Sequence, residues 1–152
     1  MRFALDTLGV RQIDRELVGI SGRITDMGPA MREVLDLIRK VEKQQFDSQG
    51  KYGSGGWKPL APSTVAYKKA YNLDPRILRA TGDLFSSMTK RGDSTQIAVP
   101  KQDGLVFGTT LEYAQYHQQG RGVPKRPVVE LKEDDRREAI KIIQRYIRED
   151  VV

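Results

Sequence analysis

The sequence contains no cysteine, and this absence excludes several kinds of site. Without thiols the chain can form neither a disulfide nor a thiolate zinc site, and it has no cysteine nucleophile. A chain of 152 residues buries enough surface on folding to be stable without such cross-links. The composition is typical of a protein made in a reducing cytoplasm.

Long apolar runs are also absent from the sequence. No run approaches the roughly 20 apolar residues that a helix needs to cross a bilayer. The N-terminal segment reaches Asp6 too early to contain the apolar region of a signal peptide. We therefore expect a soluble protein that has no membrane segment and is not exported by that route.

Groups suited to catalysis are scarce. His117 is the only histidine, and no Gly-x-Ser-x-Gly motif accompanies it, so the sequence does not indicate a catalytic triad. Asp134 and Asp135 are neighbours at the start of a predicted helix, where capping explains them better than metal binding. The glycines of residues 47–56 are not followed by the Gly-Lys-Ser/Thr of a phosphate-binding loop. We predict no enzymatic activity, no metal and no cofactor.

Positive charge is concentrated in the middle of the chain. Residues 51–128 contain twelve Lys and Arg against five Asp and Glu, whereas residues 1–50 contain eight of each. Residues 129–152 contain six basic and seven acidic residues. A central basic region can bind nucleic acid or an acidic partner. It can equally be a solvated surface with surplus lysine, and composition alone leaves both interpretations open.

The spacing of apolar residues and the positions of turn residues predict helices and strands along the chain. Helices are expected at about 10–20, 28–46, 62–70, 81–88, 113–118 and from 133 toward the C-terminus. Short strands are expected at 2–6, 96–99, 105–108 and 128–131. The Asp103-Gly104 step predicts a hairpin turn between the second and third of these strands.

Two of the predicted helices should provide most of the core. The helix that begins at Gly28-Pro29 carries one apolar stripe, formed by Met31, Val34, Leu35, Ile38 and Val41. The last helix begins with three acidic residues, and its expected buried face comprises Ala139, Ile140, Ile143, Tyr146 and Ile147. The order of helices, strands and a final helix favours an α+β fold. We predict one domain over residues 1–152, with long N-terminal helices, a small antiparallel sheet and a C-terminal amphipathic helix.

Two loops have a distinctive composition. Residues 48–58 form an expected flexible, glycine-rich loop, and Trp57 is expected to anchor its exit to the core. Residues 119–127 form a basic loop that its prolines stiffen, so that its cations can bind phosphates or acids on a neighbouring subunit. The candidate residues for contact with DNA or a partner are Arg121, Lys125, Arg126, Lys68 and Lys69.

Two sets of short motifs carry a resemblance to a known family. The first set comprises Trp57-Lys58-Pro59-Leu60, Ser63-Thr64, Lys68-Lys69 and Ile77–Leu84. The second set comprises Phe107-Gly108-Thr109, Tyr113-Ala114, His117-Gln118, Gly120 and Val123–Pro127. In their order and spacing over roughly residues 30–150, these motifs resemble the phage virion morphogenesis family, the family of Mu-like, G-type tail-completion proteins. The sequence departs from the family pattern at Lys125, where the family has a small residue, and at Val128-Val129-Glu130, where it has Phe-Leu-Gly.

The resemblance implies a structural role in virion assembly. It implies a ring-forming, homo-oligomeric subunit that acts in tail completion or head–tail joining, with other tail or neck proteins as partners and room for non-specific contact with phage DNA. Its location would be the virion tail or head–tail junction, after synthesis in the cytoplasm of the bacterial host. The residues expected to form the structural motif are Trp57, Leu60, Thr81, Gly82, Leu84, Tyr113, His117, Gly120, Pro124 and Pro127. The alternative is a nucleic-acid-binding module that uses the central basic surface.

Overall fold

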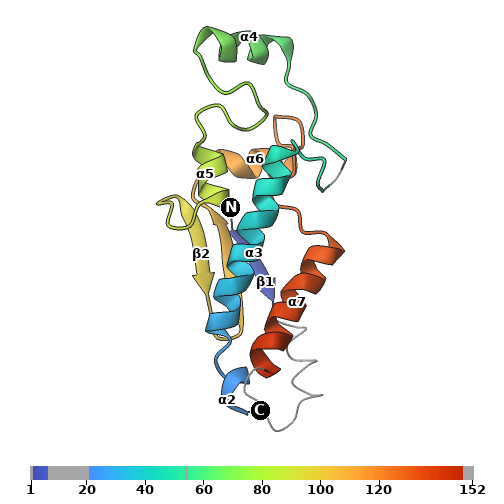
Figure 1. Ribbon diagram of the computed structural model, residues 1–152. Coiled ribbons are helices and arrows are strands. Elements are labelled where there is room, and N and C mark those ends of the chain that lie inside the picture. The colour runs from blue at the N-terminus through green and yellow to red at the C-terminus, as the bar shows by residue number, and fades with distance from the viewer. Residues whose placement is uncertain (1, 7–20, 54, 149–152) are drawn as a thin grey trace. The chain divides into compact units, whose positions relative to one another are not determined.

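The computed structural model describes residues 2–6, 21–53 and 55–148, and these residues form an α+β fold, as predicted. They contain six helices and three strands, labelled in Figure 1. The helix expected at about 10–20 lies outside the described residues. The chain divides into two compact units. Unit 1 consists mainly of residues 39–96 and 109–130, and unit 2 of residues 2–38, 97–108 and 131–152.

The longest helix is α3, Gly28–Asp47, which contributes residues to both units. Its first turn is capped by Asp26, whose Oδ1 accepts a hydrogen bond from the Gly28 N–H at 2.9 Å. The predicted apolar stripe is buried along its whole length: Met31, Val34, Leu35, Ile38 and Val41. The helix stops where Gly50 has a φ of +85° and a Cβ would lie 2.4 Å from the Trp57 ring, so only glycine fits there.

Unit 2 contains most of a three-stranded sheet. Its strands are β1, Arg2–Asp6, β2, Gln96–Pro100, and β3, Gly104–Thr109, in the order β1-β3-β2. β1 is antiparallel to β3, with Phe3 opposite Phe107. The predicted hairpin between β2 and β3 is confirmed, and the Lys101 N–H closes it by donating to the Gly104 carbonyl at 2.7 Å.

The C-terminal helix α7, Glu133–Arg148, begins with the predicted acidic turn. The Asp135 side chain caps the N-terminal end of this helix, where its Oδ2 accepts a hydrogen bond from the Lys132 N–H at 2.8 Å. The prediction that Ile140 is buried is wrong, because Ile140 is 37% exposed and Ile142 is 7% exposed. Viewed along the helix axis, Ile142 lies about 60° from Ala139, within the buried stripe. Ile140 lies about 100° from Ala139 in the opposite direction, outside this stripe.

Side chains from two helices hold α7 to the rest of unit 2. Arg23, in the short helix α2 (Ser21–Ile24), donates to the Tyr146 carbonyl at 2.5 Å, and its guanidinium lies 4.9 Å from the Tyr146 ring centre. Arg145 forms an ion pair with Glu33 of α3. Among the residues whose burial the structure describes, the buried apolar side chains of this unit are Met27, Ala30, Met31, Val34, Leu35, Ile38, Leu105, Phe107, Ala139, Ile142, Ile143 and Ile147.

Unit 1 contains the end of α3 and three shorter helices. These are α4, Pro62–Ala70, α5, Asp83–Thr89, and α6, Tyr113–Gln119, each close to its predicted position. The Phe46 ring of α3 contacts Trp57 and Phe85 edge-on, with ring centres 5.3 and 5.5 Å apart. The buried apolar side chains of this unit are Val41, Phe46, Trp57, Ile77, Leu84, Met88, Ala114 and Val128.

The strand predicted at residues 128–131 is absent, and a side chain explains why. The Gln118 Oε1 accepts hydrogen bonds from the backbone N–H groups of Val128 and Val129 at 2.7 and 3.0 Å. Its Nε2 donates to the Val129 carbonyl at 3.1 Å. The backbone groups that a neighbouring strand would pair are therefore satisfied by one glutamine.

Candidate functional site

A groove with a volume of about 960 Å³ opens on unit 1. It is lined by α4, the start of α5, α6, and the segments on either side of them, and we call it the motif groove. Its lining residues are Lys58, Pro59, Leu60, Ala61, Thr64, Lys68, Leu78, Ala80, Thr81, Gly82, Asp83, Leu84, Tyr113, His117, Val123, Pro124 and Arg126.

The motif groove brings together residues that are widely separated in sequence. Seven of the ten residues expected to form the structural motif line it: Leu60, Thr81, Gly82, Leu84, Tyr113, His117 and Pro124. The other three support its walls. Trp57 donates a hydrogen bond from Nε1 to the Pro127 carbonyl at 2.9 Å, and Gly120 ends α6 with a φ of +73°.

Two of the candidate basic residues are buried in the walls of the groove. Arg126 is 6% exposed, and its guanidinium donates to the carbonyls of Lys58 and Pro59 at 2.8 and 3.1 Å. Lys68 is also 6% exposed, and its Nζ donates to the Arg76 carbonyl at 2.6 Å. Burial lowers the pKa of both groups from their ordinary values. Both cations therefore hold backbone segments in place as well as charging the groove.

The other candidate basic residues are exposed. Lys69, Arg121 and Lys125 all have exposed side chains. Unit 1 contains 14 Lys and Arg against 7 Asp and Glu, whereas unit 2 contains 12 against 13. The excess positive charge of the protein thus belongs to the unit that contains the groove. The contact of these five residues with DNA or a partner stays a prediction.

One side chain of α3 and one backbone carbonyl join the glycine-rich loop to the basic loop. Gln45 of α3 is fully buried, and its Oε1 accepts from the Gly53 N–H at 2.9 Å. Its Nε2 donates to the Pro127 carbonyl at 3.2 Å, the same carbonyl that Trp57 reaches. The expected anchoring of the loop exit by Trp57, which is 5% exposed, is therefore present. The flexibility of residues 48–58 stays a prediction.

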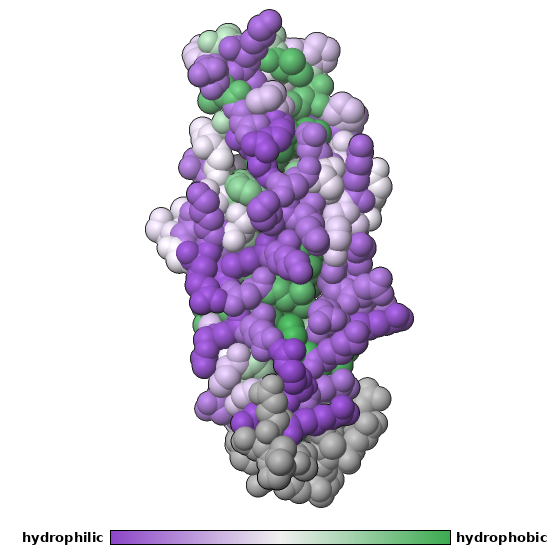
Figure 2. Space-filling view, viewed as in Figure 1, coloured by the Kyte–Doolittle hydropathy of each residue, from purple (hydrophilic) through white to green (hydrophobic). Residues whose placement is uncertain are grey.

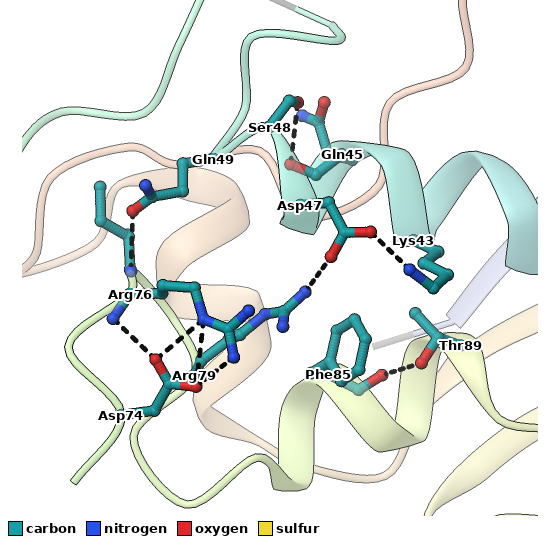
Figure 3. A network of polar contacts seen from close by, with 11 residues as sticks. Lys43, Gln45, Asp47, Ser48, Gln49, Asp74, Arg76, Arg79, Phe85 and Thr89 are labelled. Carbon is teal, nitrogen blue, oxygen red and sulfur yellow. Dashed lines mark hydrogen bonds and ion pairs between the residues drawn. The ribbon is translucent and has the colours of Figure 1, made fainter.

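A network of polar contacts positions the segment between α4 and α5 (Figure 3). Arg79 forms an ion pair with Asp47 at the end of α3, and its guanidinium stacks 3.7 Å from the Phe85 ring centre. Asp74 accepts hydrogen bonds from the Arg76 side chain and backbone, and these bonds lower the pKa of Asp74 to about 2. The backbone N–H of Ile77 donates to Gln49 Oε1 at 3.1 Å.

Backbone strain occurs in the same segment. Leu78 lines the groove and has a φ of +60°, a left-handed conformation that costs a non-glycine residue roughly 1–2 kcal/mol. Its neighbours Ile77 and Arg79 are both buried, so the fold determines the position of the segment on each side. Strain of this kind persists where surrounding contacts over-determine the backbone, and it is common at binding sites.

His117 lies in the groove wall without the partners that catalysis requires. Burial, and then the nearby positive charge of Arg126, lower the pKa of His117 from its ordinary value. In the described part of the chain, its buried Nδ1 has no hydrogen-bond partner, so no carboxylate orients it as in a triad. Asp83, the acid in the groove, instead accepts from the Thr81 hydroxyl at 2.7 Å.

Helix α4 and its C-cap residue Tyr71 present apolar side chains to solvent. Val65, Tyr67 and Tyr71 are 52%, 55% and 65% exposed, and the two tyrosine rings are 4.5 Å apart. Figure 2 shows hydrophobic residues at the surface in the region of α4. Lys68 is the only residue of this helix that is buried. A nine-residue helix with so little packing is marginal on its own.

Residues 2–6, 21–53 and 55–148 provide neither a metal site nor a membrane span. No cluster of three or more histidine and carboxylate side chains in these segments could hold a metal ion. None of their helices combines the length and apolarity that crossing a membrane would require.

Comparison with known proteins identifies a family. The model of the phage virion morphogenesis family matches residues 8–148. Neither the curated proteins nor the solved structures contain a match to the chain.

Proposed function

Because the chain belongs to the phage virion morphogenesis family, we propose that it is a structural protein of tail completion or head–tail joining. One observation supports this proposal most directly. Seven of the ten residues expected to form the structural motif, from Leu60 to Pro124, line a single groove, and Trp57 braces it through the Pro127 carbonyl. A family whose members share a partner surface would be expected to share residues in this way.

The proposed role is non-enzymatic. Polar groups in the motif groove are engaged in holding backbone segments, as Arg126 and Lys68 are, and His117 lacks an orienting carboxylate in the described residues. In the proposed role the chain acts by contact with neighbouring subunits, with other tail or neck proteins as partners, and its place is the virion tail or neck.

A gene deletion tests the assembly role. Particles made without the protein should accumulate as separate full heads and tails when viewed by electron microscopy. Supplying the chain in trans should restore joined, infectious particles. Intact and infectious virions in the absence of the protein would refute the proposal.

We also propose that the chain assembles as a ring. Its two units differ in net charge and composition, so contact between unlike faces of neighbouring copies would close a ring if the rotation permits. Size-exclusion chromatography with light scattering should give a mass several times the 17.2 kDa of one chain. A strict monomer at high concentration that also fails to bind tails would argue against ring formation.

The second candidate function is binding of nucleic acid, and the charge of unit 1 favours it. Exposed cations there include Lys69, Arg121 and Lys125. Binding through phosphates should weaken steeply as salt rises, because each phosphate contact releases counterions. Fluorescence anisotropy with duplex DNA at low and at high salt would test it, and an affinity unchanged by salt would exclude this mode.

A further inference from the structure

The motif groove combines apolar surface with fixed positive charge. Its apolar lining is supplied by Pro59, Leu60, Ala61, Leu78, Ala80, Leu84, Val123 and Pro124. Three cations accompany this lining, since Lys68 and Arg126 are held in the walls and Lys58 is exposed at the rim. Asp83 is the one acid among the lining residues, so the cations outnumber the acids by three to one. A complementary ligand must therefore offer both apolar side chains and carboxylates.

The helix that forms one wall of the groove lacks packing on its own. Lys68 is the only buried residue of α4, and the segments that connect this helix to the rest of unit 1 are loops (Figure 1). A chain segment inserted in the groove would cover Thr64 and Lys68 of α4 and Ala61, the residue that precedes the helix. The helix would then gain contacts that the isolated chain does not provide.

We propose that the motif groove is the docking site for an extended peptide segment of a different virion protein, one that carries apolar and acidic side chains. This inference rests on the proposed assembly function and names the chemistry of the partner at this site. An extended segment is favoured because the lining is divided among several separate segments, each of which can contact a different side chain of a peptide laid along the groove.

A second copy of the same chain is a poorer match among the described residues. The exposed acids of α7 are accompanied by nearby bases: Glu133 and Asp134 lie 3.7 Å from Arg137, and Glu138 lies 3.5 Å from Lys141. These acids therefore form a mixed-charge surface, which the positive groove would not select. Duplex DNA would satisfy the cations but would leave the apolar lining uncovered.

Site-specific photo-crosslinking in the full-length protein tests the occupant. Benzoylphenylalanine placed at Thr64 or Val123, which line the groove, should crosslink during phage assembly to one acidic, apolar peptide of another virion protein. Benzoylphenylalanine at Val99, an exposed residue of β2 that does not line the groove, serves as the control and should not capture that peptide. Crosslinks to a second copy or to DNA would overturn the inference, as would assembled particles without any groove crosslink.

Charge reversal tests the same contact independently. Lys58→Glu changes an exposed side chain and leaves its carbonyl available to Arg126, so urea unfolding should match the wild type. The variant should be incorporated into particles at least roughly tenfold less well. Lys51→Glu, at an exposed cation of unit 1 outside the groove, should be incorporated normally.

The outcomes separate the inference from the proposed function. If deletion of the gene blocks assembly but Lys58→Glu is incorporated normally, the docking inference fails and the assembly role stands. If deletion leaves virions intact, the proposed function itself fails.

Discussion

Arg126 and Lys58 lie 68 residues apart in sequence, and the Nε of Arg126 donates a hydrogen bond to the Lys58 carbonyl at 2.8 Å. The same guanidinium reaches the Pro59 carbonyl, so one side chain joins the basic loop to the segment that precedes α4. Arg126, which the sequence suggests as an exposed cation, is thus a buried residue that links two backbone segments.

Replacing this guanidinium should destabilise the fold. Arg126→Met preserves much of the side-chain volume but leaves two carbonyls without their donor, and we expect the free energy of unfolding to fall by about 2 kcal/mol. Arg126→Lys should be intermediate, because lysine keeps the charge but not the fork of donors. Urea unfolding measures both, and an unchanged midpoint for Arg126→Met would contradict the assigned role.

Gln118 should be similarly sensitive. Gln118→Leu removes the partners of three backbone groups, and we expect a loss of about 2 kcal/mol in unfolding free energy with faster hydrogen exchange at Val128 and Val129. Gln118→Glu retains the acceptor for both N–H groups and should cost less. Equal losses in the two variants would show that acceptance by Oε1 is not what holds this segment.

Two glycines of the basic loop provide a matched pair. Gly120 and Gly122 have φ values of +73° and +70°, so alanine should cost roughly 1 kcal/mol at either position. A Cβ at Gly120 would also lie 2.9 Å from the Lys125 Cβ, whereas a Cβ at Gly122 meets nothing within 4 Å. Gly120→Ala should therefore lower the thermal midpoint more than Gly122→Ala, and the reverse order would count against the packing of this loop.

The stability of the fold should depend on pH through His117, the only histidine. Its pKa is lowered in the folded state, so below the unfolded value of about 6.5 the unfolded chain binds more protons. The contribution of the neutral, half-buried ring is complete above that pH and is lost as pH falls toward the folded-state pKa. Urea unfolding at pH values from about 7 down to about 5 should show declining stability, and His117→Gln should flatten the decline. An identical slope in the variant would assign the dependence to other groups.

Elements that are marked by a regular spacing of apolar residues or by a turn dipeptide were predictable from the sequence. The stripe from Met31 to Val41 determined the buried face of α3, and the Asp103-Gly104 step placed the hairpin of β2 and β3 correctly. These features depend on residues that are close together in the chain. Local spacing therefore determines them almost completely.

Features that depend on distant partners were not predictable. Val128-Val129 has the composition of a strand, but Gln118 occupies its hydrogen-bonding groups. The only indication in the sequence that Gln118 has a structural role was its place beside His117 in a family motif. Lys68 and Arg126 were expected as surface cations because their carbonyl acceptors, at Arg76 and Lys58, become neighbours only in the folded chain.

The motif groove shows the same division. Its residues were singled out one motif at a time, from Leu60 through Leu84 to Pro124, but nothing in their spacing indicated that they line one cavity. The walls of the motif groove are held by the polar network around Arg79 and by the hydrogen bonds of Gln45 and Trp57 to the Pro127 carbonyl. Such tertiary contacts have no periodicity in the sequence.

Helix α3 supplies buried side chains on both sides of Ile38–Arg39, one of the points at which the chain passes from one unit to the other. Cutting the chain there would sever a continuous helix and expose Val34 and Leu35 in one fragment and Val41 and Phe46 in the other. Neither fragment would keep its share of the core. The two units therefore cannot be studied as separate fragments. A partial deletion is expected to unfold the whole chain, so its phenotype should match that of complete loss of the protein.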